Sequence, residues 1–185
     1  MKKRILGVVG SPRKKGNTDV LVSRILAGAK SEGAKTDHLY LKNKVINPCN
    51  GCHTCWKGKD CNKKDDMNRF YPKIIQSDIL ILGTPVYWYG PTAMMKGFID
   101  RFVYFNCPEH RVKIRGKSVV IVIPFEENDI KTAAPVVEFF KRCLNYLEMD
   151  LAGEIIVPGV TKPGEVRSNQ TMMEKAFQLG VQLTK

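Results

Sequence analysis

Four cysteines lie within 13 residues of the chain, close enough in sequence to bind one metal centre. Cys49, Cys52, Cys55 and Cys61 follow the pattern C-x2-C-x2-C-x5-C. Compact runs of this kind, with three cysteines in x2 succession and a fourth nearby, favour an iron–sulfur cluster of the 4Fe-4S type. Structural zinc sites usually use two C-x2-C pairs separated by a longer spacer. The spacing therefore favours the cluster, with zinc or free thiols as the alternatives.

The other two cysteines, Cys107 and Cys143, are isolated in the sequence. A chain whose cysteines gather at one place does not have the pattern of a disulfide framework. Cys143 lies beside the apolar stripe of an expected helix, so we expect it to be buried and to behave as a small apolar residue.

A second group of polar residues follows the first apolar run. The stretch from Gly10 to Thr18 reads GSPRKKGNT and joins an expected strand to an expected helix. Backbone N–H groups and the helix dipole favour an anion there, and Ser11, Asn17 and Thr18 add neutral donors. The stretch is neither a Walker A motif nor a three-glycine dinucleotide motif. With the single arginine Arg13, it suits the phosphate monoester of a mononucleotide such as FMN; an ordinary turn before a capped helix is the alternative.

Three consecutive aromatic residues follow the third expected strand. Tyr87, Trp88 and Tyr89 stand between Pro85 and Pro91, and seven of the 16 aromatic residues lie between positions 87 and 105. A surface loop has little structural reason to display such residues. We therefore expect this segment to bury a flat ligand, a partner subunit, or both, with packing in the chain's own core as the alternative.

Apolar periodicity predicts five strands that alternate with five helices. The strands are expected at residues 3–10, 36–41, 78–83, 118–123 and 155–157. Four helices are expected at about 17–33, 93–102, 136–147 and 168–183, and another uses Met67, Phe70 and Ile74. Asn17 or Thr18 is the expected N-cap of the first helix, and Asp65 or Asp66 that of the second. Such alternation predicts a parallel sheet with helices on both faces and ligands beyond the carboxyl ends of the strands.

Length and charge limit the classes of function. The 185 residues suit one domain, and the net charge of +12 is concentrated in residues 1–45, which hold 11 basic and 3 acidic residues. No nucleic-acid recognition motif accompanies this charge, so we read it as solvated lysines around an anion site. No apolar run approaches the roughly 18 residues of a membrane span and no signal peptide is evident, so we expect a cytoplasmic protein with neither membrane nor nucleic acid as partner. Within residues 111–117, every second residue is basic, as expected for one side of an extended segment at the edge of the sheet.

Three motifs in order resemble the flavodoxin-like NAD(P)H-dependent FMN reductase superfamily over about residues 4–150. They are Ser11-Pro12-Arg13 with Gly16-Asn17-Thr18, then Pro85-Val86-Tyr87-Trp88, then Met95-Lys96-Gly97-Phe98-Ile99-Asp100-Arg101. The resemblance implies an α/β three-layer sandwich with a five-stranded parallel sheet of order 2-1-3-4-5. It also implies dimers or tetramers with the flavin near a subunit interface. One departure is the stretch Pro124-Phe125-Glu126-Glu127-Asn128, where family members often have a glycine-rich loop.

The same resemblance assigns residues to cofactors. FMN phosphate would lie in the first loop and its isoalloxazine ring against the second, which gives as contacts Ser11, Arg13, Asn17, Thr18, Pro85, Val86, Tyr87, Trp88, Tyr89 and Gly90. The cysteine motif in such a fold resembles the iron–sulfur flavoproteins of anaerobic archaea and bacteria. That subfamily implies a cluster loop at about residues 45–64 with Cys49, Cys52, Cys55 and Cys61 as its ligands.

The hypothesis that follows is a redox enzyme in which FMN and a 4Fe-4S cluster on the same edge of the sheet do the chemistry, so no side chain is nominated as catalytic. NAD(P)H or a ferredoxin-like protein would donate the electrons. A non-enzymatic flavodoxin-like electron carrier is one alternative, an FMN reductase whose cysteines bind zinc or no metal is another, and a nucleic-acid or zinc-binding module is a third. Self-association through the aromatic segment 87–105 is also expected.

Overall fold

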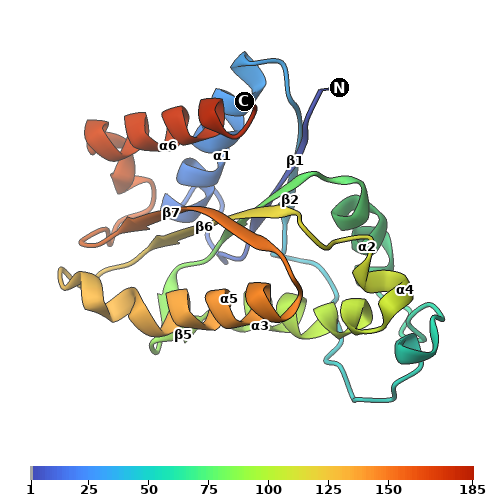
Figure 1. The fold of residues 1–185 in the computed structure, drawn as a ribbon. Helices are drawn as coiled ribbons and strands as arrows, with labels where there is room; N and C mark the ends of the chain where they lie inside the picture. Colours follow the sequence, from blue (N-terminus) through green and yellow to red (C-terminus); the bar gives the residue numbers. More distant parts are fainter. Residues whose placement is uncertain (1) are drawn as a thin grey trace.

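The computed structural model describes residues 2–185 and contains the predicted parallel sheet (Figure 1). Its order is β2-β1-β3-β6-β7, which is the predicted 2-1-3-4-5, because β4 and β5 form a separate hairpin. The five strands of the sheet are β1 (Arg4–Val9), β2 (Lys35–Tyr40), β3 (Ile79–Gly83), β6 (Ser118–Pro124) and β7 (Asp150–Val157). All four pairings between neighbouring strands are parallel, so the carboxyl ends of all five strands lie at one edge.

The burial pattern of each strand follows from where the strand lies in the sheet. The central strands β3 and β6 are buried on both faces, which is why they read as continuous apolar runs. The edge strand β7 is half-exposed over much of its length and begins at Asp150, five residues before the predicted start. The prediction from apolar residues therefore included only the buried end of β7. The pairing of β7 with β6 also contains an irregularity between Val119 and Val120.

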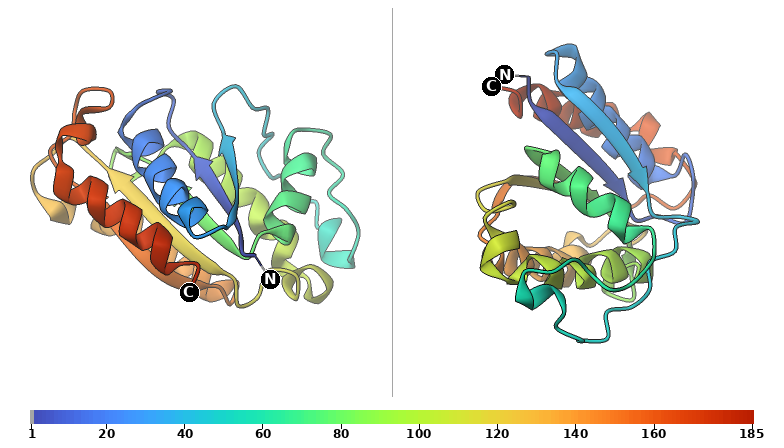
Figure 2. Two further views of the ribbon diagram at one scale, coloured as in Figure 1. Left: turned by 90° about the horizontal axis from the view of Figure 1, so that it is seen from above. Right: turned by 90° about the vertical axis from the view of Figure 1, so that its right-hand side faces the viewer.

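Helices cover both faces of the sheet and form two separate cores (Figures 1 and 2). One layer consists of α1 (Asn17–Ser31) and α6 (Gln170–Gln182). The other contains α2 (Met67–Gln76), α3 (Ala93–Asp100) and α5 (Ala134–Tyr146). Alternate residues of β1 belong to different cores, Leu6 to the second layer's core and Ile5 to the first layer's, as the period of two of a strand requires.

The aromatic residues after the hairpin pack inside the chain's own core. The chain continues from α3 into the 3-10 helix η2 (Arg101–Asn106) and the short helix α4 (Pro108–Arg111). Phe98, Phe102 and Phe105 are all buried, and their rings meet edge to face. Packing in the chain's own core, the alternative given above, therefore holds for Phe98, Phe102 and Phe105.

The basic segment that follows is helical rather than extended. Arg111 ends α4, and residues 112–116 form turns before β6 begins. Arg111 and Arg115 both pair with Glu148, at 3.6 and 2.8 Å. The alternation of charges in the sequence therefore does not mark a strand edge.

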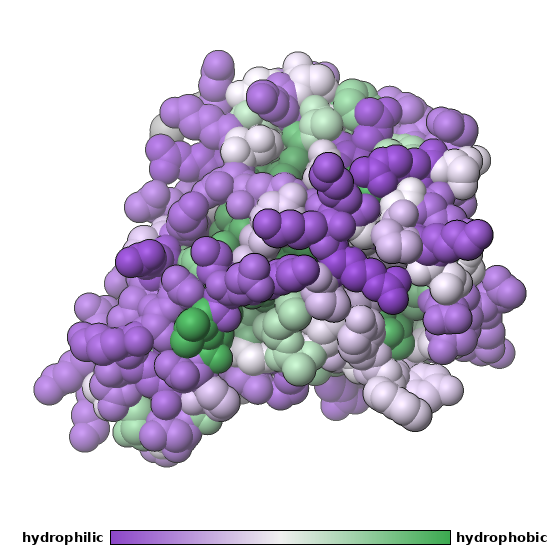
Figure 3. Space-filling model, turned by 180° about the vertical axis from the view of Figure 1, so that it is seen from behind, coloured by the Kyte–Doolittle hydropathy of each residue, from purple (hydrophilic) through white to green (hydrophobic). Residues whose placement is uncertain are grey.

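The face shown in Figure 3 is largely hydrophilic, with apolar residues scattered between charged ones. Among residues 2–185, the structure contains no helix with the length and apolar character that crossing a membrane requires.

Candidate functional site

A cleft opens where the ends of β1, β3, β6 and β7 meet, and we call it the strand-end cleft. The four loops that follow these strands contribute its walls. The residues that line it are Ser11, Arg13, Gly16, Asn17, Thr18, Pro85, Val86, Tyr87, Pro124, Phe125, Glu126, Val160, Thr161 and Pro163. All four predicted phosphate contacts are among them, together with the first three predicted contacts of the aromatic loop. The prediction of ligand binding at the carboxyl edge of the sheet thus has a matching cleft.

The turn that begins the phosphate loop (residues 10–18) is held by β3 and α3. The backbone N–H of Gly10 donates to the carbonyl of Gly83 at 2.7 Å, and the hydroxyl of Thr92 donates to the carbonyl of Gly10 at 2.6 Å. A Cβ atom at Gly10 would lie 2.8 Å from the Cβ of Met95. Only glycine therefore permits this close approach to α3.

The first turn of α1 carries no side-chain cap. Gly16 is the N-cap residue, so the expectation that Asn17 or Thr18 caps this helix is wrong. The first backbone N–H groups of a helix have no partner within the helix. Because Thr18 and Gly16 line the cleft, these donors and the positive end of the helix dipole lie beside it.

Asn17 and Arg13 are both tied to the loop after β7. The Asn17 amide donates to the carbonyls of Lys162 and Val160 at 3.1 and 3.3 Å, and its oxygen accepts from the backbone N–H of Val166 at 3.1 Å. Arg13 donates to the carbonyl of Thr161 at 3.0 Å. The Asn17 side chain is thus a tie between loops, while Ser11, Thr18 and backbone N–H groups remain as donors toward an anion.

The loop after β7 is the part of the cleft that the sequence motifs missed. Val160, Thr161 and Pro163 line the cleft, although none of them belongs to a predicted binding motif. A signal was present, because Pro158-Gly159 and Pro163-Gly164 mark turns directly after the last predicted strand. The loop after β6, which departs from the family pattern, also contributes through Phe125 and its neighbours.

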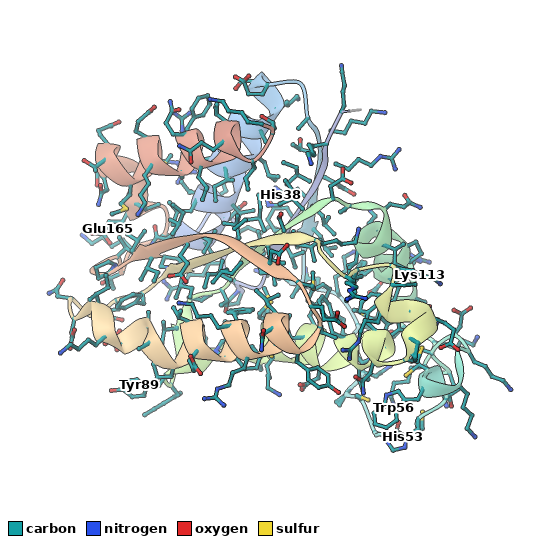
Figure 4. All side chains as sticks on the ribbon, in the orientation of Figure 1. His38, His53, Trp56, Tyr89, Lys113 and Glu165 are labelled. Carbon is teal, nitrogen blue, oxygen red and sulfur yellow. The ribbon has the colours of Figure 1, made fainter. Side chains whose placement is uncertain are left out.

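The aromatic loop forms a two-stranded hairpin of β4 (Val86–Tyr87) and β5 (Gly90–Pro91). Trp88 and Tyr89 occupy the turn with φ of 48° and 58°, the left-handed region that two-residue hairpin turns require and that glycine or asparagine usually fills. Trp88 is 97% exposed, Tyr89 is also exposed (Figure 4), and neither lines the cleft. The structure therefore brings Tyr87 to the cleft and leaves Trp88, Tyr89 and Gly90 outside its lining.

All four cysteines of the loop between β2 and α2 line a second pocket, which we call the cysteine pocket. Its remaining walls include Tyr71, Arg101, Val103 and Tyr104. At the exposed tip of the loop, the rings of His53 and Trp56 stack with centroids 4.1 Å apart (Figure 4). Within residues 2–185, no three His, Cys, Asp or Glu side chains surround a single-ion position. A four-iron cluster places its own iron and sulfide atoms between the thiolates, so its ligands need not converge on one point.

The thiols of this pocket differ in their electrostatic surroundings. Burial raises the pKa of Cys55, and the neighbouring Cys61, Cys49 and Cys52 raise it further. Hydrogen bonding to Thr54 lowers the pKa of the exposed Cys52 thiol, and the charge of Lys63 adds to this effect. All four thiols line the same pocket.

A buried cation lies beside the pocket. Arg101 is 1% exposed, pairs with Asp65 and donates to the Sγ of Cys61 at 3.2 Å. Burial alone would lower the pKa of Arg101, but the hydrogen bond to Asp65 raises it above its usual value, so the guanidinium remains charged. Asp65 also accepts from the N–H of Met67 at 3.0 Å, so one of the two predicted cap residues does hold the start of α2.

Cys107 and Cys143 lie outside the cysteine pocket. Cys107 is buried, and Cys143 is half-buried rather than fully buried. Burial raises the pKa of the Cys143 thiol. The expectation that Cys143 is buried is therefore only partly met, and both cysteines lie apart from the other four.

Helix α3 connects the strand-end cleft to the cysteine pocket. It begins next to Thr92, whose hydroxyl binds Gly10, and it ends at Asp100, directly before Arg101. Within residues 2–185, no residue lines both sites. The two pockets are therefore separate: the cysteine loop starts at the carboxyl end of β2, and its residues 55–57 pack against η2. An eight-residue helix spans about 12 Å.

Comparisons with known proteins agree with this arrangement. The family model for NADPH-dependent FMN reductase matches residues 3–129. An iron-sulfur flavoprotein of Archaeoglobus fulgidus is 32% identical over 177 residues, which cover 96% of this chain and 77% of that protein. An iron-sulfur flavoprotein of Methanocaldococcus jannaschii is 39% identical over 98 residues, which cover 53% of this chain and 51% of that protein.

Among solved structures, the Trp repressor binding protein of Bacillus subtilis superposes with a TM-score of 0.73 at 24% sequence identity, covering 96% of this chain and 99% of that one. This likeness concerns the fold alone. The family model and the Archaeoglobus relative each cover most of the chain, including the phosphate loop, the hairpin and the cysteine loop. The chain therefore belongs to the iron-sulfur flavoproteins of the flavodoxin-like NAD(P)H-dependent FMN reductase superfamily.

Proposed function

We propose that this chain is an FMN-dependent oxidoreductase that carries a 4Fe-4S cluster on Cys49, Cys52, Cys55 and Cys61. The observation that carries the proposal is that all four cysteines line one pocket beside a buried arginine, at the opposite end of α3 from a cleft of neutral phosphate donors. When bound, FMN supplies two-electron and one-electron chemistry and the cluster supplies one-electron transfer. The protein's own task is to bind and orient both groups and to limit solvent.

In the strand-end cleft, Ser11, Thr18 and the first amides of α1 would bind the FMN phosphate, and Arg13 would add a charged donor. Tyr87 and Phe125 would lie against the rest of the flavin, since they line the same cleft on the loops after β3 and β6. Asn17 would act indirectly, because its amide holds the loop after β7 in place.

In the cysteine pocket, the apolar walls favour a cluster over a solvated single ion. Tyr71 and Tyr104 stack with centroids 4.0 Å apart and form one wall, while Val103 approaches Cys55, whose sulfur lies 3.9 Å from the Val103 carbonyl oxygen. Burial raises the pKa of Tyr104 to about 12, and its hydroxyl donates to Asp60 at 3.2 Å. Tyr104 therefore stays neutral and fixes the loop near Cys61.

NAD(P)H and an acidic ferredoxin-like protein are both proposed as electron donors. The family supports the first, and charge on the cysteine loop supports the second. Lys57, Lys59 and Lys64 are exposed around the cysteine pocket, and basic surfaces of this kind steer acidic partners. The two routes differ in their salt dependence, since only steering between proteins would slow markedly as ionic strength rises.

The test is an anaerobic purification followed by absorption spectroscopy with iron, sulfide and zinc analysis. We expect FMN, about four iron and four sulfide per chain, and a broad visible absorbance beyond that of flavin. Added NAD(P)H should bleach the flavin absorbance without a protein donor. Stoichiometric zinc with no iron would contradict the cluster, and bleaching only by a reduced ferredoxin would favour the non-enzymatic electron carrier.

We also propose that the chain forms a homo-oligomer through the hairpin tip. Trp88 and Tyr89 are exposed on a turn whose backbone conformation is costly for residues other than glycine, asparagine or aspartate. A second copy would cover the two rings. A purely monomeric sedimentation profile at micromolar concentration would contradict this, and Trp88→Ser should shift an oligomer toward monomer.

A further inference from the structure

A buried ion pair joins the two ends of the cysteine loop. The Asp65 side chain is 0% exposed and the Arg101 side chain 1%, and a guanidinium nitrogen of Arg101 lies 2.5 Å from a carboxylate oxygen of Asp65. That nitrogen also donates to the carbonyl of Asn47 at 2.9 Å, while the same carboxylate accepts from the N–H of Asn47 at 2.9 Å. The start of the loop at Asn47 and its end at Asp65 are therefore clamped to α3 and η2 by one pair of side chains.

The second terminal nitrogen of the same guanidinium points to a cysteine. It donates to the Sγ of Cys61 at 3.2 Å, within the cysteine pocket. A guanidinium is planar and rigid, so fixing one nitrogen on Asp65 and Asn47 also fixes the direction of the other. The position of the Cys61 sulfur relative to the loop base is thus set by one side chain.

Loop closure alone gives no reason for this arrangement. A buried ion pair is often no more stabilising than well-packed apolar residues of similar volume. A second pair of hydrogen bonds already joins the loop ends. The backbone N–H of Val45 donates to the Asp66 carboxylate at 2.9 Å, and the backbone N–H of Asp66 donates to the Val45 carbonyl at 3.0 Å. What Arg101 adds is a positive charge and a donor directed at one sulfur.

We propose that Arg101 is the positioning residue of the cysteine pocket: it holds Cys61 toward the other three cysteines and donates a hydrogen bond to its sulfur when the cluster is bound. This inference rests on the proposed function. Hydrogen bonds and positive charge at ligand sulfurs favour the more negative, reduced state of a cluster, so Arg101 raises the reduction potential. It also keeps the loop closed in the metal-free protein.

The experiment compares three variants of the full-length chain. Removing Arg101 alone would leave the buried Asp65 carboxylate without a cationic partner, so the main variant is the double substitution Arg101→Gln with Asp65→Asn, which removes both charges. Arg101→Lys keeps the charge and loses the planar fork. The matched control is Arg111→Gln, because Arg111 lies on the neighbouring helix α4 and binds Tyr146 and Asn106 without touching the cysteine loop.

Two measurements follow on protein reconstituted with iron and sulfide. In the double variant we expect a more negative cluster midpoint potential and loss of iron to a chelator that is about 10 to 100 times faster, the usual cost of removing an outer-shell partner. Arg101→Lys should retain most of the potential while releasing iron faster, and Arg111→Gln should match the wild type. A double variant with wild-type potential and wild-type iron release would overturn the inference.

A third measurement separates this inference from the proposed function. Hydrogen exchange on the metal-free chain should be faster across residues 45–67 in the double variant than in the wild type or Arg111→Gln, with exchange in β1 and α1 unchanged. Unchanged exchange would overturn the clamp whatever metal the wild type binds. A wild-type chain that takes up zinc and no iron would overturn the proposed cluster, yet the exchange experiment would still decide whether Arg101 orders the loop.

Discussion

The phosphate loop and the cysteine loop follow neighbouring strands of the sheet but are held in different ways. Residues 10–18 after β1 contact β3, α3 and the loop after β7 through hydrogen bonds from several elements. Residues 41–66 after β2 contain only the short 3-10 helix η1 (Cys55–Lys57). The two ends of this cysteine loop are held together by Arg101, Asp65 and a few backbone contacts. The phosphate loop is supported by the fold itself, whereas the cysteine loop depends on a few side chains.

This difference has an energetic consequence. Hydrogen bonds distributed over several elements each contribute about 0.5 to 1.5 kcal/mol, so losing one weakens the phosphate loop without opening it. Breaking a buried ion pair by removing one partner costs about 3 to 5 kcal/mol, because the remaining charge is left without compensation. A substitution that breaks the Arg101–Asp65 pair should therefore have a larger effect than the loss of any one hydrogen bond at the strand-end cleft.

The largest expected effect is at a proposed cluster ligand. Cys52→Ser should abolish the visible absorbance beyond that of flavin and leave FMN bound, because the strand-end cleft shares no residue with the cysteine pocket. The measurement is an absorption spectrum with iron and flavin analysis after anaerobic reconstitution. Cys143→Ser is the matched control, since Cys143 lies on α5 outside the pocket. Loss of FMN together with iron would show that the two regions are not independent.

The next effect is graded and confined to the strand-end cleft. Arg13→Ala should weaken FMN binding by about 1.5 to 3 kcal/mol, the contribution of a hydrogen bond to a charged group, and should leave iron content unchanged. Flavin fluorescence titration measures the affinity. Lys14→Ala serves as the control for net charge, because Lys14 is exposed and does not line the cleft. Equal losses in the two variants would assign the effect to net charge rather than to Arg13.

A smaller effect tests the tie between the phosphate loop and the loop after β7. Asn17→Ala removes three hydrogen bonds, and because the site is partly exposed we expect the free energy of unfolding to fall by about 1 to 2 kcal/mol. Urea denaturation of the cofactor-free chain measures this, with Asn145→Ala on α5 as the control. If Asn17→Ala weakens FMN binding and does not change stability, the amide contacts the phosphate directly instead.

The smallest expected effect is on the pH dependence of the free energy of unfolding, on the α1 side of the molecule. Burial lowers the pKa of His38 from 6.5, although the Asp19 carboxylate opposes this shift. The unfolded chain then binds the proton more readily than the folded chain, so stability falls as pH drops below about 6.5 and levels off below the folded pKa. His38→Gln should flatten this slope between pH 7.5 and 5.5, as measured by denaturation. Equal slopes for both proteins would contradict the assignment.

Much of the fold was predictable because buried strands and amphipathic helices leave clear periodic patterns. The runs at 79–83 and 118–124 are apolar throughout because both faces of the sheet are covered, and the strand order followed from the family resemblance. The half-exposed start of β7 and the 3-10 helix η2 carry no such pattern. Their conformations depend on tertiary contacts, such as the packing of Phe105 against Tyr71.

The site was predictable where it consists of local motifs and not where it depends on distant contacts. The sequence located the phosphate loop, with an ordinary turn as the alternative, and the four cysteines, which the structure brings to one pocket. The pairing of Arg101 with Asp65 joins residues 36 positions apart, and the contribution of Val160 and Thr161 to the cleft requires β7 to lie beside β6. Within the hairpin, sequence did not distinguish Tyr87, which lines the cleft, from the exposed Trp88.

Helix α3 has a consequence for the rate of electron transfer. It begins at the turn that holds Gly10 and ends one residue before Arg101. Electron tunnelling slows steeply with distance, and a helix of eight residues resists both stretching and bending. Under the proposed function, α3 would fix the separation of the phosphate-loop turn from Arg101, and any motion of the cysteine loop would still change the distance that electrons cross.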